Sequence, residues 1–70
     1  MKTTTMYTVS TYNESPVNTI EYKGCSRLEA DLKMLEAIRN NKHGVMIETV
    51  IVENNEFNYK KEESKIIKTF

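Results

Sequence analysis

The segment 44–59, GVMIETVIVENNEFNY, would be apolar on both faces if it formed a strand. Alternate residues of a strand point to opposite faces. One face would therefore carry Val45, Ile47 and Ile51, and the other Met46, Val50 and Val52. A chain of 70 residues has little other material with which to cover both faces. We expect one apolar face to be covered by another molecule; the alternative is that the two C-terminal strands curl enough to bury both.

The length and the scarcity of cysteine and histidine restrict how the fold can be stabilised. The 70 residues make a single domain, 1–70, and a domain of this size buries only roughly 60% of the surface that its unfolded chain exposes. Cys25 is the single cysteine and His43 the single histidine, which excludes an internal disulfide and a structural zinc site. We expect no metal and no cofactor. Stability must come from packing within the chain or across an interface.

The charge is balanced, with ten basic and ten acidic residues, and no segment carries a large excess of either sign. Nucleic acid is therefore not expected as the main partner, because binding to phosphates relies on a basic excess. No apolar run is long enough for a membrane helix, and the N-terminal MKTTTMYTVS lacks the apolar core of a secretory signal. We expect no membrane association and a cytoplasmic location.

The first half of the chain predicts a hairpin followed by a helix. The hairpin is expected over 4–23, where β-branched and aromatic residues flank the turn signal NESP. The helix is expected over 26–43. Ser26 and Glu29 fit a capping box at its start, and Gly44 could take the left-handed conformation that ends a helix.

The second half predicts another hairpin and an apolar end. The hairpin is expected over 45–63, around the turn signal ENNE, because Asn tolerates positive φ in a hairpin loop. An apolar C-terminal tail is expected over 64–70. The order β-β-α-β-β indicates a small α+β domain in which one helix lies on an antiparallel four-stranded sheet.

The expected helix has two apolar stripes. The wider one, spaced as i, i+4, i+7 and i+10 and expected to face the sheet, consists of Leu28, Leu32, Leu35 and Ile38. The second consists of Ala30, Met34 and Ala37; it either widens the core contact or accepts another surface closely. Glu29 and Lys33 are expected to form an i, i+4 pair on the solvent side.

Residues that could carry catalysis are few. His43 lies near the expected helix end, where a cation stabilises the helix dipole. Cys25 precedes the helix cap; a nearby helix terminus can lower the pKa of a thiol, but a small side chain packed under the helix is the more common arrangement. There is no glycine-rich phosphate loop and no metal-ligand spacing. We therefore expect no catalytic residues and a protein that is not an enzyme.

The first half of the chain resembles the small dimeric bacteriophage inhibitors of uracil-DNA glycosylase. The resemblance rests on Tyr7-x-Val9, on the run Glu21 to Gly24 (EYKG), and on Ser26 at the start of a helix. It implies a short phage protein that disables one host protein by binding it, and a protein encoded by a phage would act in the host cytoplasm. Those inhibitors are more acidic and present an aromatic residue from their helix, whereas this helix has none, so no binding residue is carried over.

These observations favour a non-enzymatic protein-binding module, a phage-type inhibitor or adaptor that occupies a surface of a host protein. We also expect a homodimer, formed through the bare face or an edge of the sheet. The expected partner or dimer interface consists of Val50, Val52, Phe57, Tyr59, Ile66, Ile67 and Phe70. One alternative is a small nucleic-acid-associated protein that stacks bases on sheet tyrosines. Another is a self-assembling structural subunit.

Overall fold

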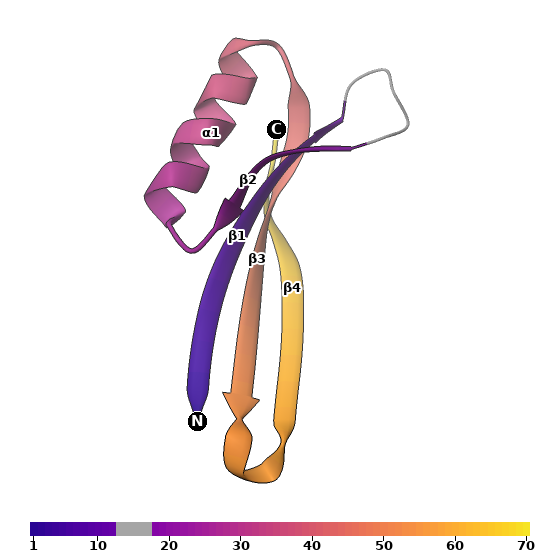
Figure 1. Ribbon diagram of the computed structural model, residues 1–70. Coiled ribbons are helices and arrows are strands. Elements are labelled where there is room, and N and C mark those ends of the chain that lie inside the picture. Colours follow the sequence, from indigo (N-terminus) through magenta and orange to yellow (C-terminus); the bar gives the residue numbers. More distant parts are fainter. Residues whose placement is uncertain (13–17) are drawn as a thin grey trace.

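The computed structural model describes residues 1–12 and 18–70, and the predicted NESP turn falls outside these residues. Its elements, in chain order, are β1 (Lys2–Tyr12), β2 (Thr19–Gly24), α1 (Arg27–Arg39), β3 (His43–Asn54), the short 3₁₀ helix η1 (Asn55–Phe57) and β4 (Tyr59–Thr69). All neighbouring strands are antiparallel, in the order β2-β1-β3-β4. This confirms the predicted α+β domain of one helix and a four-stranded sheet (Figure 1).

The helix covers only one half of the sheet. It packs against β2, β1 and the start of β3 (Figure 1). A helix of 13 residues is roughly 20 Å long, whereas strands of 11 or 12 residues span nearly twice that length. The sheet therefore continues past the helix as a bare, three-stranded extension, and the molecule measures 46 × 26 × 14 Å. We call this extension the arm; it consists of residues 2–6, 49–54 and 59–64 with η1.

The strand register shows which face of β3 is covered by the helix. Val9 lies opposite Met46 in the register of β1 with β3, and both are fully buried, which places the even-numbered residues of β3 on the helix side. Val50 and Val52 share that face but lie in the arm, beyond the helix. The odd-numbered residues, including Ile47 and Ile51, lie on the opposite face. Neither face of β3 is covered along its whole length by the described residues.

The prediction for the inner face of the helix was wrong. The stripe against the sheet is Ala30, Met34 and Ala37, all buried. The core also contains Val9 and Met46, and the bulky side chains packed around it are Tyr7, Tyr22, Ile67 and Phe70. Because these large side chains already fill the space above the sheet, small helix residues allow the closest approach. The wider leucine stripe is consequently turned outward.

The helix also ends earlier than predicted. It stops at Arg39, and Asn41, at φ 58°, takes the left-handed conformation that was expected of Gly44. Gly44 lies within β3 and has no positive φ. It is needed for close contact instead, because a Cβ there would collide with the carbonyl oxygen of Ser10 on β1. His43 is likewise part of β3 and does not cap the helix.

The C-terminal residues form a strand, where an appended tail was expected. Residues 64–69 belong to β4, and Phe70 exchanges backbone hydrogen bonds of 2.8 and 2.9 Å with Gly44. The turn before β4 is longer than a two-residue loop, and Asn58, at φ 50°, supplies its positive φ. Ile67 and Phe70 can therefore reach back to the core.

Candidate functional site

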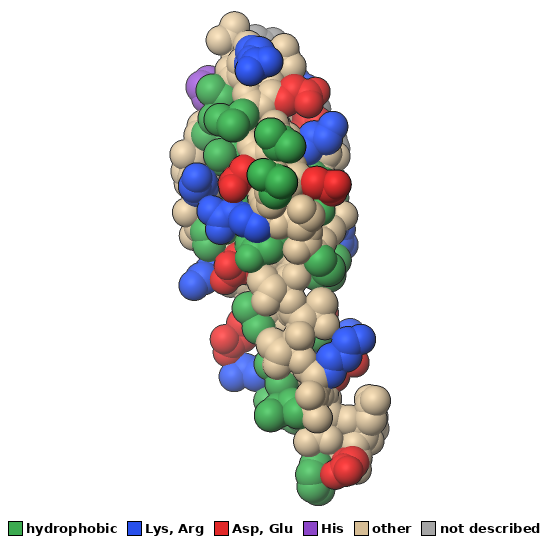
Figure 2. All heavy atoms as spheres, turned by 90° about the vertical axis from the view of Figure 1, so that its left-hand side faces the viewer, with side chains coloured by type: hydrophobic (Ala, Val, Ile, Leu, Met, Phe, Trp, Pro, Cys, Tyr) green, Lys and Arg blue, Asp and Glu red, His purple; other side chains and the backbone are tan. Residues whose placement is uncertain are grey.

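The outer face of α1 carries the most exposed group of large apolar side chains on the covered half of the molecule. Its members, with exposed fractions of 69, 56, 52 and 45%, are Leu28, Leu32, Leu35 and Ile38. We call this group the leucine ridge. Figure 2 shows hydrophobic side chains gathered over the helix, interrupted by charged groups of both signs. An exposed apolar patch of a few hundred Å² commonly marks an interface.

The N-terminal end of the ridge is fixed by a hydrogen-bonded cap. The Ser26 hydroxyl accepts the Glu29 amide at 3.2 Å, as the capping box predicts. The reciprocal bond is made by another residue, because the Ser26 amide donates to Tyr22 Oη at 3.1 Å. Tyr22 belongs to β2 and packs against the core. The first turn of the helix is therefore held to the sheet, and Leu28 in it points away.

The C-terminal end of the helix is fixed by an ion pair with the sheet. Lys42 Nζ donates to Glu21 Oε1 at 3.1 Å, and the buried Thr11 hydroxyl donates to the same oxygen at 2.9 Å. These two hydrogen bonds hold the pKa of Glu21 below its ordinary value of 4.5, and the bond from Lys42 has the larger effect. The Lys42 amide also donates to the Ala37 carbonyl at 2.9 Å. Both ends of α1 are thus anchored, which fixes the direction in which the ridge faces.

One side of the ridge is lined by an ion pair. Arg27 Nε lies 3.3 Å from Asp31 Oδ1, and the Arg27 guanidinium lies 5.6 Å from the centre of the Tyr7 ring. The hydrogen bond to Asp31 raises the pKa of Arg27. On the solvent side Lys33 pairs with Glu36 at 3.8 Å, where a Glu29–Lys33 pair was expected. The ridge is therefore an apolar strip with a polar rim, which is the usual anatomy of a protein interface.

The residues expected at an interface from the sequence are divided among three places. Val50, Val52 and Tyr59 lie on the helix-side face of the arm, with Phe57 at its tip, 77% exposed. Ile66 lies opposite Ile47, on the other face, and is 61% exposed. Ile67 and Phe70 pack against the core and are only partly exposed. The structure does not gather the seven into one surface.

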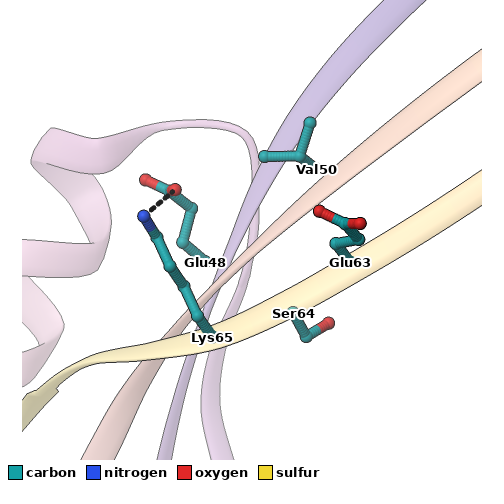
Figure 3. Close-up of a pocket in the computed structure, with 5 residues that line it drawn as sticks. All are labelled: Glu48, Val50, Glu63, Ser64 and Lys65. Atoms are coloured by element: carbon teal, nitrogen blue, oxygen red, sulfur yellow. Dashed lines mark ion pairs between the residues drawn. The ribbon is translucent and has the colours of Figure 1, made fainter.

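A shallow hollow of about 360 Å³ lies where the arm meets the covered half. Figure 3 shows its lining residues, Glu48, Val50, Glu63, Ser64 and Lys65. Lys65 Nζ lies 3.8 Å from Glu48 Oε1, across the β3–β4 pair. Glu63 instead pairs with Lys61 at 2.8 Å, and this bond lowers the pKa of Glu63. The hollow is therefore lined by carboxylates that are neutralised by lysines of the same sheet.

The candidate chemical residues lie far apart. Cys25 is exposed just before α1, which corrects the expectation that it packs under the helix. His43 lies after the helix, at the start of β3. The intervening helix separates them by roughly 20 Å, too far for direct proton transfer. Within residues 1–12 and 18–70 no three His, Cys, Asp or Glu side chains are grouped to hold a metal.

The tyrosines do not form one platform. Tyr7 and Tyr22 pack against the core. Tyr12 lies opposite His43 at one end of the sheet, and Tyr59 lies opposite Asn54 at the tip of the arm. A protein that stacks the bases of single-stranded nucleic acid needs several aromatic rings side by side on one surface. The four tyrosines are not arranged in this way.

Comparison with known protein families, curated proteins and solved structures finds no match for this chain. No helix in the described part of the chain has the length and apolar character needed to cross a bilayer.

Proposed function

We propose that this protein is a non-enzymatic binding module that inserts the leucine ridge into an apolar groove of another protein. The observation that supports the proposal is the outward direction of Leu28, Leu32 and Leu35, each more than half exposed on a helix anchored at both ends. The exposed part of each leucine contributes little to the stability of the isolated chain. A partner surface would bury it.

The spacing of the ridge supports a helix-in-groove mode of binding. Leu28, Leu32 and Leu35 occupy positions i, i+4 and i+7, which are the anchor positions of amphipathic helices that bind in grooves. Ile38 extends the line to the end of the helix. The Arg27–Asp31 pair on the rim would add orientation, whereas the buried leucines would supply most of the affinity.

The short length, the balanced charge and the wide separation of Cys25 from His43 favour action by occupying a surface. We therefore propose the role of an inhibitor or adaptor, of the kind that phages use against a host protein. In this role the protein blocks or recruits its target and changes no covalent bond. The cytoplasm of the host is the compartment that goes with this role.

The test is capture followed by a quantitative titration. The chain is used as bait in bacterial lysate, the captured protein is identified and purified, and its affinity is measured for Leu32→Glu and Leu35→Glu. Both changes place a charge in the centre of the ridge, and each is expected to weaken binding at least 100-fold. Lys33→Glu is the matched control, since it adds the same group to the solvent side of α1.

Circular dichroism of each variant shows whether the fold is retained. Binding by Leu32→Glu and Leu35→Glu as tight as that of the unchanged chain would contradict the proposal. His43→Ala and Cys25→Ala separate binding from catalysis: each is expected to bind and act normally, and an inactive but folded His43→Ala would favour an enzyme.

A further inference from the structure

β1 has an open edge along its first five strand residues, Lys2–Met6. On one side these residues pair with Glu53–Thr49 of β3. On the other side, the pairing with β2 reaches only as far as Tyr7, which lies opposite Gly24. Figure 1 shows the N-terminal half of β1 extending beyond the end of β2. Among the described strands none pairs with this segment on that side, so alternate backbone amide and carbonyl groups there have no strand partner.

The two outer edges of the arm differ in chemistry. The β4 edge carries Lys60, Lys61, Glu62, Glu63 and Lys65. Charged residues of this kind prevent one edge from pairing with another. The β1 edge instead reads Thr3-Thr4-Thr5-Met6, which is uncharged and mostly β-branched, and its register with β3 contains no bulge. Apart from Lys2, it therefore lacks the charges that protect the β4 edge.

We propose that the occupant of this edge is the same segment of a second copy, paired antiparallel about a two-fold axis at Thr4. In this register Thr4 lies opposite Thr4 of the second copy, Thr3 opposite Thr5, and Lys2 opposite Met6. Each pair joins residues of the same parity, so the faces of the two sheets coincide and cross-strand threonine pairs form. The two sheets then continue as one, with both helices on the same face.

The length of the open edge matches the same edge of a second copy. The edge ends at Gly24 and at the turn into α1, so it accepts a strand of about five residues, roughly 17 Å. The open edge of a second copy has that length and ends in the same way. A partner strand that continued beyond Met6 would collide with Gly24 and with the start of the helix. In a second copy the same block limits the pairing at the other end, so the two open edges match over their whole length. An interface of this kind is isologous, which is the common arrangement in homodimers.

Charge also permits self-association. The formal net charge of the chain is zero, so two copies do not repel each other as a whole. Lys2 is the single charged residue of the open edge, and it lies opposite Glu53 of its own β3. The pairing would convert the two exposed arms into one wider sheet. The leucine ridge remains free in this dimer, so the inference does not depend on the proposed function.

The test is sedimentation equilibrium of charge variants at the two-fold axis. Thr4→Lys places two like charges opposite each other in the dimer, and so does Thr4→Glu. For each variant alone, the dissociation constant of the dimer is expected to be at least tenfold higher than for the unchanged chain. The variant then sediments mainly as the 8.2 kDa monomer. An equimolar mixture of the two is expected to recover the dimer, because opposite charges then face each other. Recovery also demonstrates that the variants are folded.

Ser64→Lys is the control, since it adds a lysine to the protected β4 edge, and it is expected to dimerise normally. An unchanged chain that is monomeric at 100 µM would overturn the proposal. Equal dimerisation of Thr4→Lys, Thr4→Glu and the unchanged chain would overturn it as well. A dimer that dissociates with Leu32→Glu and persists with Thr4→Lys would place the interface on the leucine ridge instead.

Discussion

The covered half of the molecule and the arm share the same strands but differ in how their residues are buried. Met46 and Val52 belong to the same strand and face the same side of the sheet. Met46 lies under the helix and is fully buried, whereas Val52 lies beyond the helix and is only partly buried. Both residues are apolar, so their burial is decided by the element above them. Strand hydrophobicity alone does not define the core of this domain.

The two regions also differ in what holds them together. The covered half has a buried cluster that joins sheet and helix. The arm is held by its strand ladder and by exposed side-chain pairs, such as the Thr49–Ser64 hydrogen bond of 2.8 Å and the Lys61–Glu63 pair of 2.8 Å. Exposed pairs contribute little to stability. The arm should therefore open locally before the covered half unfolds, which suits a region that gains a strand from a second copy.

The largest expected difference is between Met46→Ala and Val52→Ala. Truncation of the fully buried Met46 leaves a cavity and should lower the free energy of unfolding by about 2 to 5 kcal/mol. Val52 is only half-buried, so its truncation should cost about 1 kcal/mol or less. Urea denaturation of the two variants measures both values. Similar losses would mean that the arm has a core of its own, and the contrast between the regions would fail.

The close approach of β3 to β1 is tested by Gly44→Ala. The added Cβ would collide with the Ser10 carbonyl, and it would lie 2.9 Å from the Cα of Thr11. Backbone atoms cannot move aside as a side chain does, so we expect a loss of about 1 to 3 kcal/mol. Gly24→Ala is the matched control, because the atoms nearest to its Cβ would belong to the Tyr22 side chain and not to the backbone. A greater loss for Gly24→Ala would show that Tyr22 is the more rigid neighbour.

Local patterns in the sequence were sufficient to predict the order of the elements. The Ser26 cap and the two hairpins depend on residues close together in the chain, and they are found in the structure. The helix face could not be chosen in this way, since both of its stripes are apolar. The face that packs on the sheet is decided by Tyr7, Tyr22 and Phe70, which fill the space above the sheet. These residues come from β1, β2 and the C-terminus, so their positions relative to one another are not set by local sequence.

The dependence of the helix face on distant residues also explains why the sequence alone did not place the leucine ridge on the surface. Leu32 and Leu35 were recognised as a prominent stripe but were assigned to the core. The signal that could have placed them outside is the small size of Ala30 and Ala37, which suits close packing. The open edge of β1 needed the strand register, because the sequence does not say where β2 stops pairing with β1.

A smaller effect is expected from Glu21→Gln, which removes the charge that links β2 to Lys42 at the end of the helix. The loss should be about 1 kcal/mol at neutral pH, because the pair is only partly buried. The pKa of Glu21 is lowered in the folded chain, so its contribution is complete above the ordinary value of 4.5 and is lost as the pH falls through the lowered value. The unfolding free energy of Glu21→Gln should therefore depend less steeply on pH below 4.5. An unchanged acid limb would show that the pair does not stabilise the fold.

The smallest effect is expected in the arm, from Lys61→Gln. Lys61 pairs with Glu63 two residues away on the edge strand β4, and both side chains are more than half exposed. Solvent and salt screen such a pair, so the unfolding free energy should not change measurably, at low salt or at high. Hydrogen exchange gives the regional control: amides of Val50 and Val52 should exchange faster than that of Met46 in the unchanged chain, and by the same ratio in the variant. A measurable loss of unfolding free energy that disappears in high salt would show that the charges of β4 hold the arm together. The arm would then be stabilised by the charges on its edge strand, whereas the covered half is stabilised by its buried core.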